Sequence, residues 1–345
     1  MPINYEPIDT TTDVATTRTL LHEVIPLTGT IVSGTYGTFP NDDNIKNYSH
    51  GMFQSVYDYP YLSSSANHIF DLTAGFDESS PLSGSVSSVQ ETKKINMYNQ
   101  FSQVLLGYTG STNRVRLFES DLTLDEDSPM KETIFVNLSR LLTKDEIKKG
   151  SVSITLGTAS WANPFSGRKT FTDADAAENA GTLNTIGGDY GILSSSTGVG
   201  GVIFYQAGVM VLTSSIWAGT TDFFSQSGTA RTFDNQLVSG SISGSADAFR
   251  HRLYNLQFNN TTEINSTVYF CRMPHNKFNY SSNPTYLNAG SIRVKNNSRN
   301  NPPISYITTV GLYNSQNELL AVAKLSEPLR KDPTNELTLR VRLDY

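Results

Sequence analysis

The carboxylate-rich segments of this 345-residue chain are the residues best suited to chemistry. Asp173, Asp175 and Glu178 stand in the segment FTDADAAENAG, and carboxylates in alternation can chelate Ca²⁺. The segment lacks the glycine at the sixth position and the glutamate at the twelfth that complete an EF-hand. A second acidic segment, LDEDSP at residues 124–129, has the composition of a solvated loop. We therefore predict no metal site and no bound cofactor.

The histidines and glycines do not form a catalytic motif. No two histidines have the i, i+4 spacing of a metal-binding helix, and the chain lacks the G-x-S-x-G, Walker and G-x-G-x-x-G patterns. Gly198, Gly200 and Gly201 precede an expected strand, whereas a phosphate cradle needs the amides of a helix N-terminus. We predict a non-enzymatic protein without catalytic residues. The histidines, expected as surface or hydrogen-bonded residues, are His22, His50, His68, His251 and His275.

Carbohydrate chemistry stays open as an alternative. A glycosidase needs two carboxylates across a cleft, which sequence spacing in a β fold does not exclude. Exposed aromatic rings could stack on sugars, although packing in a core or an interface is the commoner use of such residues. A carbohydrate-binding or glycan-cleaving receptor protein is therefore the second hypothesis. The aromatic candidates are Tyr57, Tyr59, Tyr61, Trp161 and Trp217.

The composition favours short strands joined by turns. Hydrophobic residues make up 37% and charged residues 17% of the chain, and Ser, Thr, Asn and Gly fill the difference. Ser, Thr and Asn compete with helical hydrogen bonds, and glycine costs conformational entropy in a helix. The 17 Tyr and 17 Phe argue against disorder.

The charge and the cysteine count exclude several classes of protein. The net charge is -6 and no Lys/Arg block is present, so we expect no nucleic-acid partner. Cys271 is the single cysteine, which excludes an internal disulfide framework. No run approaches the roughly 18 apolar residues of a membrane span, and the N-terminus lacks the pattern of a signal peptide. We expect no membrane partner and synthesis in a cytoplasm.

Three helical segments are predicted from capping and spacing. Ser88 with Glu91 forms a capping box before a helical pattern that ends at Gly107. Thr143 with Glu146 predicts a second capping box and a single turn. Residues 245–257 have an apolar face at helical spacing.

The remaining pattern is that of strands. Residues 131–142 and 151–157 alternate, and residues 201–217 predict a hairpin that turns at Ala207-Gly208. In the last strand Leu337, Leu339, Val341 and Leu343 face one way, which indicates one buried and one solvated face. Further strands are expected at residues 20–36, 264–273, 291–296, 305–313, 318–326 and 336–345.

These elements predict a mainly β fold, an antiparallel β-sandwich-like arrangement with long loops and two or three short helices. We expect an extended N-terminal arm at residues 1–18 and an N-terminal β region with one helix at residues 19–128. Residues 129–345 are expected to form a β-sandwich domain with a loop-rich insertion at about 158–258.

The C-terminal segment, residues 306–345, resembles a β module of tailed-bacteriophage tail and tail-fibre proteins. It pairs the strand ITTVGLY with LLAVAK across a polar turn, and a final alternating strand follows. The segments SRLLTKDEIKKGSVSITLG, FTDADAAENAG and GVIFYQAGV, within residues 138–205, are similar to structural proteins of myovirus-type phages. In tail fibres the module lies near the N-terminus and a long shaft follows, whereas here it ends the chain, which favours a baseplate or tail component.

The resemblance implies a structural component of a tailed-phage virion, assembled in the host cytoplasm. Such a tail or baseplate protein would bind other virion structural proteins and copies of itself, and would bridge to fibres. A host glycan is a further contact that the resemblance allows. A head, neck or decoration subunit is the third hypothesis.

Overall fold

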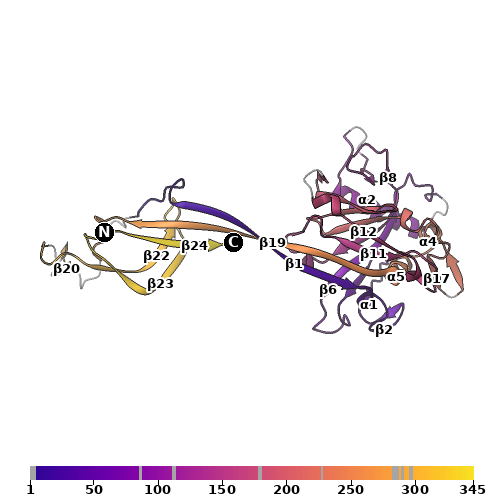
Figure 1. The fold of residues 1–345 in the computed structure, drawn as a ribbon, viewed down its shortest axis with the longest axis horizontal. Coiled ribbons are helices and arrows are strands. Elements are labelled where there is room, and N and C mark those ends of the chain that lie inside the picture. Colours follow the sequence, from indigo (N-terminus) through magenta and orange to yellow (C-terminus); the bar gives the residue numbers. More distant parts are fainter. Residues whose placement is uncertain are drawn as a thin grey trace. The chain divides into compact units, whose positions relative to one another are not determined.

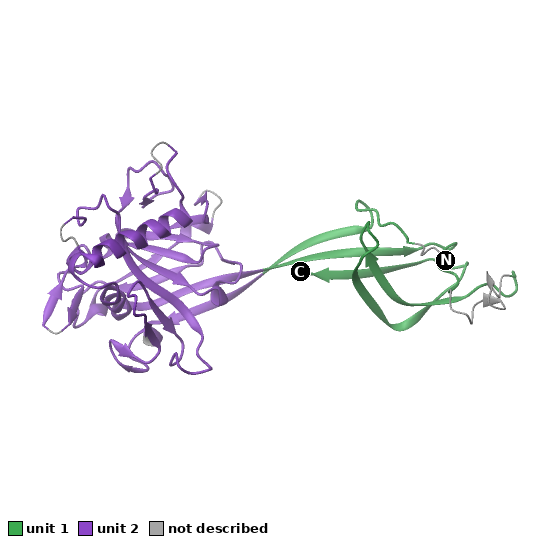
Figure 2. Cartoon of the chain, turned by 180° about the vertical axis from the view of Figure 1, so that it is seen from behind, with its two compact units in different colours: residues 1–20, 263–345 green, residues 21–262 purple. Residues whose placement is uncertain are grey.

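The chain folds into two compact units. The computed structural model describes residues 5–84, 88–110, 114–177, 181–226, 228–281, 287–288, 291–294 and 298–345. Unit 1 comprises residues 1–20 and 263–345, and unit 2 comprises residues 21–262 (Figure 2). The boundaries fall inside the strands β1 (Val14–Thr28) and β19 (Leu253–Met273). This grouping differs from the predicted division at residues 18 and 128, because it joins the N-terminal segment to the C-terminal strands.

Strands dominate both units, so the prediction of a mainly β fold is confirmed (Figure 1). The sheet of unit 2 has the order β1-β19-β11-β12-β14-β15-β16-β9-β6-β5-β4, and neighbours from β19 to β4 are antiparallel. Residues 158–258, expected as a loop-rich insertion, supply β12, β14, β15 and β16 in the middle of this sheet. The strands are β4 (Ile45–Asn47), β5 (Gln54–Tyr57), β6 (His68–Phe76), β9 (Glu132–Leu138), β11 (Ser153–Gly157), β12 (Arg168–Thr172), β14 (Gly188–Ser195), β15 (Gly198–Phe204) and β16 (Val209–Thr213).

Shorter strands flank this open sheet. β10 pairs with β19, and β13 pairs with β14. β2 pairs with β3, and β17 pairs with β18; these two hairpins have strands of two and three residues, respectively. Their bounds are β2 (Gly37–Thr38), β3 (Asn41–Asp42), β10 (Glu146–Ile147), β13 (Thr182–Thr185), β17 (Phe224–Gln226) and β18 (Thr229–Arg231).

The sheet of unit 2 curls around its larger core. In α5 (Ile242–Arg252), Asp247 accepts a hydrogen bond from Gln54 of β5, and Arg252 donates to the carbonyl of Gly157 in β11. These helix residues are five positions apart, about 7.5 Å along the axis. β5 and β11 are seven positions apart in the strand order, about 34 Å in a flat sheet. The sheet therefore bends until both strands reach the same helix, and α4 (Phe233–Ser239) packs into the same core.

Both faces of the central strands are buried. In β9, Ile134, Val136 and Leu138 point into the larger core, as their alternation predicted, and Phe135 points to the opposite face. That opposite face is covered by α2 (Val89–Leu105) and by the hairpin of β7 (Phe118–Glu119) and β8 (Pro129–Met130) (Figure 1). This pattern gives unit 2 two separate hydrophobic clusters.

The helix α2 begins and ends as its sequence predicts. The Ser88 hydroxyl accepts the Glu91 backbone N–H at 3.2 Å, and Gly107, with φ of 82°, follows the last turn. The helix approaches β6 closely at Gly75. A Cβ atom on Gly75 would lie 2.6 Å from the carbonyl oxygen of Lys94, so only glycine leaves room for the helix there.

One local helix prediction is wrong and another is confirmed only in part, both for tertiary reasons. The capping box of Thr143 and Glu146 does not form, because Ser139 caps the earlier turn α3 (Arg140–Thr143) and Glu146 already begins β10. The helix predicted at residues 245–257 ends at Arg252, because Leu253 and the following residues pair in the sheet. The predicted hairpin at residues 201–217 is confirmed as β15 and β16, with Gly208 at φ of 69°.

Unit 1 is built from long strands. β24 (Leu337–Asp344) pairs with residues Ser266–Met273 of β19, and β22 (Ser305–Tyr313) pairs with β23 (Leu319–Lys331). The predicted alternation of β24 is confirmed: Val341 is buried, whereas Arg340 and Arg342 are exposed. β20 (Leu287–Asn288) and β21 (Ser291–Val294) pair as well, and the end of the strand predicted at 291–296 lies outside the described residues.

The segment expected as an N-terminal arm is tied to unit 1. Residues 14–18 already belong to β1, and Asp13 precedes it. The Asp13 carbonyl accepts the backbone N–H of Phe270 at 2.8 Å, and its carboxylate pairs with Arg272 at 2.6 Å. The segment is not extended throughout, because the Asp13 N–H donates to the Asp9 carbonyl at 2.8 Å in a turn, and it is held by hydrogen bonds within its own chain.

Candidate functional site

Asp173, the first residue of the acidic segment, has a structural role. It is 1% exposed, and its two carboxylate oxygens accept the backbone N–H groups of Gly150 and Val152 at 2.8 Å. The Tyr205 hydroxyl donates to it at 3.0 Å. Burial raises the pKa of the Asp173 carboxyl, and this effect is larger than the lowering of the pKa by the hydrogen bonds that the carboxylate accepts. Asp175 lies exposed in the short helix η2 (Ala174–Ala177), and Glu178 lies outside the described residues. The structure thus places Asp173 as a loop anchor.

The second acidic segment contributes one residue to a cluster of three carboxylates. Oxygens of Glu119, Asp121 and Asp127 lie within 4.8 Å of one another; only Asp127 belongs to the segment, whereas Glu119 ends β7 and Asp121 follows it. Such oxygens could hold a divalent cation. The Ser128 hydroxyl donates to Asp121, and the backbone N–H of Glu126 donates to Glu119 at 3.0 Å. Because these hydrogen bonds hold the loop without an ion, the cluster by itself does not indicate a metal site.

The charges of this acidic cluster follow from its surroundings. Burial raises the pKa of Glu119, and the neighbouring charge of Asp125 raises that of Asp127. The hydroxyl of Ser128 lowers the pKa of Asp121. The cluster is therefore a set of coupled carboxylates in which Asp121 is the most acidic.

A Ser, an Asp and a His meet on β5 and β6. His68 Nε2 lies 2.8 Å from a carboxylate oxygen of Asp71, and the Ser55 hydroxyl donates to that same oxygen. A hydrolytic triad needs the imidazole between the serine and the acid, so that the imidazole can accept the serine proton. Here the carboxylate lies between them. The arrangement cannot activate Ser55 as a nucleophile, and the spacing in the sequence did not point to it.

The other histidines are dispersed. His22 contacts the carbonyl of Asn260 at 3.3 Å, and His50 stacks on Tyr48 with 5.2 Å between ring centroids. His275 pairs with Glu336 at 3.1 Å. None of these three approaches a second histidine among the contacts of the described residues.

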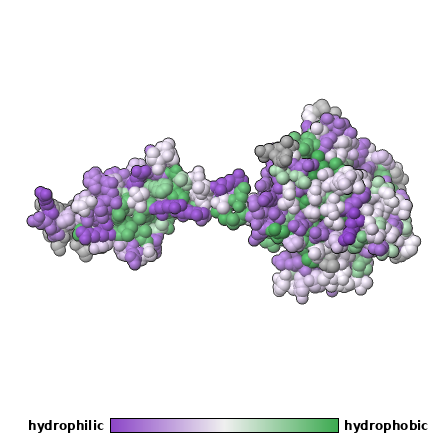
Figure 3. Space-filling view, in the orientation of Figure 1, coloured by the Kyte–Doolittle hydropathy of each residue, from purple (hydrophilic) through white to green (hydrophobic). Residues whose placement is uncertain are grey.

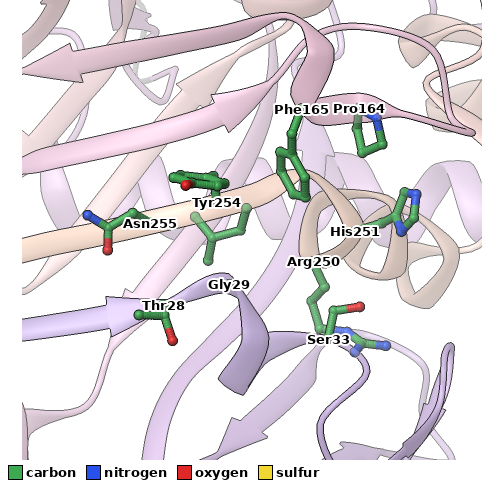
Figure 4. A pocket seen from close by; sticks show the side chains of 10 residues that line it. Thr28, Gly29, Ser33, Pro164, Phe165, Arg250, His251, Tyr254 and Asn255 are labelled. Carbon is green, nitrogen blue, oxygen red and sulfur yellow. The ribbon is translucent and has the colours of Figure 1, made fainter.

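A pocket of about 670 Å³ lies beside the C-terminal end of α5 (Figure 4). Phe165 and Tyr254 line it from two different elements, with their rings 5.4 Å apart. The guanidinium of Arg168 lies 4.5 Å from the Tyr254 ring. Tyr254 is 46% exposed and is the pocket's most accessible aromatic ring in the described residues. The pocket is thus an aromatic-sided depression.

The charged residue of this pocket is not free to bind a ligand. Arg250 is fully buried, and its five N–H groups donate within the chain. The neighbouring His251 donates from Nε2 to the Trp161 carbonyl at 2.9 Å, and burial lowers its pKa. The Arg250 acceptors are Gln54, Val32, Asp42, Pro40 and Asp247.

The aromatic residues proposed as a sugar-stacking surface do not form one surface. Trp217 is 1% exposed in the larger core. Trp161 packs on the ring of His251, with 4.2 Å between centroids. Tyr57 contacts Tyr61 at 6.2 Å, whereas Tyr59 contacts Tyr36 instead. Of the five, all of which the structure describes, only Tyr59 and Tyr61 are exposed, at 47% and 36%.

Unit 1 has the least complete core of the molecule. Both hydrophobic clusters of the described residues consist of side chains from unit 2. Among the side chains of unit 1 whose burial the structure describes, the buried apolar ones are Val268, Met273, Leu312 and Val341, at 5–8% exposure. Its exposed apolar side chains, at 37–75% exposure, are Tyr5, Leu20, Tyr280, Tyr306, Tyr313, Leu319, Leu320, Val322 and Tyr345.

The N-terminal strand is also open to solvent. Residues 15–24 of β1 are all exposed, including Leu20, Leu21 and Val24. β1 is the last strand on its side of the sheet. A long edge strand with unpaired backbone groups is a ready template for pairing with another chain. The uncovered surfaces of unit 1 and β1 are therefore the candidate functional surfaces, and the sequence pattern did not reveal them.

Among the described residues, no helix combines the length and the apolar character needed to cross a membrane. Comparison of the chain with protein-family models, with curated proteins and with solved structures found no match.

Proposed function

We propose that the chain is a non-enzymatic structural component of a tailed-phage virion, a tail or baseplate protein that assembles with other virion subunits and bridges to fibres. The observation that carries the proposal is the incomplete core of unit 1. A unit of this size normally buries one hydrophobic core. The apolar residues that unit 1 leaves exposed are well suited to burial against neighbouring subunits.

The phage-like segment coincides with this unit. Residues 306–345 form β22, β23 and β24, and the turn between the two hairpin strands is polar, as in the module that the segment resembles. We further propose that the curled sheet of unit 2 makes that unit sandwich-like. We expect virion localisation, and no nucleic-acid or membrane partner for a chain of net charge -6.

Mass spectrometry of purified particles tests this proposal. A virion component should be present at a fixed stoichiometry, and its absence from particles would overturn the proposal. A map of the particle at side-chain resolution would then distinguish a tail or baseplate position from the head, neck or decoration alternative.

The second candidate function is carbohydrate binding, and the pocket beside α5 favours it. Tyr254 is exposed there next to Phe165, and aromatic faces are suitable for stacking on sugar rings. A glycan array with the wild-type chain and with Tyr254→Ala tests this function. Binding that the substitution abolishes would support it, and the absence of glycan binding would remove it.

A further inference from the structure

Near its turn, the hairpin β22–β23 carries apolar residues on both of its faces. On the inner face, Leu312 lies opposite Ala321 and is 8% exposed. On the outer face, Tyr313 lies opposite Leu319, and Val322 lies opposite Gly311. Residues opposite one another in a ladder point to the same side. The outer face therefore carries a hairpin patch, which consists of Tyr313, Leu319, Leu320 and Val322 at 45%, 52%, 67% and 51% exposure.

This outer face is unlike the solvated face of the neighbouring unit-1 strand. β24 presents Thr338, Arg340 and Arg342 to solvent, as a strand with one wet face should. Apolar residues on both faces are the pattern of a strand that is covered on both sides. Figure 3 shows hydrophobic residues gathered on unit 1 in the region of β22 and β23. The patch thus has the composition of an interior surface and the exposure of an external one.

The hairpin forms a sheet of its own within unit 1, and side-chain contacts join it to the rest of the unit: the Tyr5 ring lies 5.0 Å from the Tyr313 ring, and the Ser305 hydroxyl donates to the Phe278 carbonyl. β22 and β23 form a two-stranded sheet, and two strands by themselves are marginally stable in water. A second layer packed about 10 Å away would close the structure into two packed sheets.

We infer that the hairpin patch is the surface at which a second copy of this chain packs, face to face. The patch itself carries no charge, so two identical patches do not repel one another. Apolar surfaces of this kind are typical of obligate contacts between identical subunits. The inference deepens the proposed assembly function, on which its biological setting rests.

The charges at the two ends of the patch identify the second copy as the occupant. Glu318 precedes the patch, and Lys324 follows it on the outer face, opposite Thr309. Neither has an ion-pair partner among the described residues. Both lie three residues from Ala321. When two hairpins pack antiparallel about a two-fold axis near Ala321, Glu318 of one copy comes opposite Lys324 of the other.

The first experiment compares variants of the full-length chain by analytical ultracentrifugation. The wild-type chain should self-associate, and Leu320→Lys with Val322→Lys should weaken association at least tenfold. Thr338→Lys, on the solvated face of β24, is the matched control and should associate as the wild type does. A monomeric wild-type chain would overturn the inference, as would a patch variant that associates normally.

The second experiment tests the pairing of the end charges, and it decides the matter if the patch variant does not fold. Glu318→Lys alone should weaken association, and Glu318→Lys combined with Lys324→Glu should restore it, because the two charges exchange places. A double variant as weak as the single variant would contradict the antiparallel arrangement. The substitutions are at exposed positions, so circular dichroism should be unchanged.

The outcome is separable from that of the proposed function. If the chain self-associates through the patch but is absent from particles, this inference stands and the virion role is overturned. If the chain is found in particles but its self-association depends on neither the patch nor the end charges, the virion role stands and this inference is overturned.

Discussion

The Arg250 guanidinium and the Asp42 carboxylate form a fully buried ion pair, with Nη1 3.1 Å from Oδ2. The two residues are 208 positions apart in the chain. The pair joins the loop around β3 to helix α5, and Asp247 on the same helix also accepts from Arg250 at 2.8 Å. This contact is one of those that hold α5 against the curled sheet.

Asp42→Ala should destabilise unit 2 by about 3 kcal/mol, because it leaves a buried guanidinium with one carboxylate fewer. Urea unfolding followed by tryptophan fluorescence measures this directly, since Trp161 and Trp217 both lie in unit 2. Asp175→Ala is the control, because this exposed carboxylate also lies in unit 2. It should leave the free energy of unfolding nearly unchanged. Equal effects of the two substitutions would contradict the structural role of Asp42.

Asp173→Asn should destabilise unit 2 by about 1–3 kcal/mol, because the NH2 group of asparagine replaces one of the two carboxylate oxygens that accept buried N–H groups and cannot itself accept a hydrogen bond. Asp175→Asn at the exposed neighbouring carboxylate should be neutral. The free energy of unfolding from urea titrations of both variants checks this. A neutral Asp173→Asn would show that Gly150 and Val152 do not depend on the carboxylate.

Acidification should destabilise unit 2 through His251. Burial lowers its pKa in the folded state, whereas the unfolded chain takes up the proton at a pKa of about 6.5. The stabilisation of the neutral ring is therefore complete above about pH 6.5 and is lost as the pH falls through the range between the two pKa values. His251→Gln, which can still donate to the Trp161 carbonyl, should flatten the dependence of the unfolding free energy between about pH 7 and 5. His275→Gln is the exposed control, and an unchanged slope in His251→Gln would contradict the assignment.

Gly75→Ala should separate α2 from the sheet. The added methyl group would lie 2.6 Å from the Lys94 carbonyl oxygen, which is backbone and cannot rotate away. We expect a loss of about 1–3 kcal/mol, as for other overpacked sites. Gly219→Ala has no heavy atom within 4 Å of the new Cβ and serves as the control. Thermal unfolding of the two variants compares them, and equal midpoints would mean that the helix can move at little cost.

Local patterns were sufficient for elements whose boundaries depend on neighbouring residues. The helix from Ser88 to Gly107 was predicted because its cap and its terminating glycine are within a few residues of it. The β15–β16 hairpin and the alternation of β24 were predicted for the same reason. The turn at residues 140–143 was misplaced, because two potential caps compete and only packing decides between Ser139 and Thr143.

What the sequence determined by itself was the strand-rich class, the local hairpins and the segment that resembles a phage module. Only the tertiary structure decided that Asp173 anchors a loop, that Ser55, Asp71 and His68 meet in the wrong order for catalysis, and that β22–β23 leaves an apolar face uncovered. The physical reason is that alternation shows which residues share a face of a strand, but not whether another layer covers that face. Covering depends on contacts between residues far apart in the chain, or between chains.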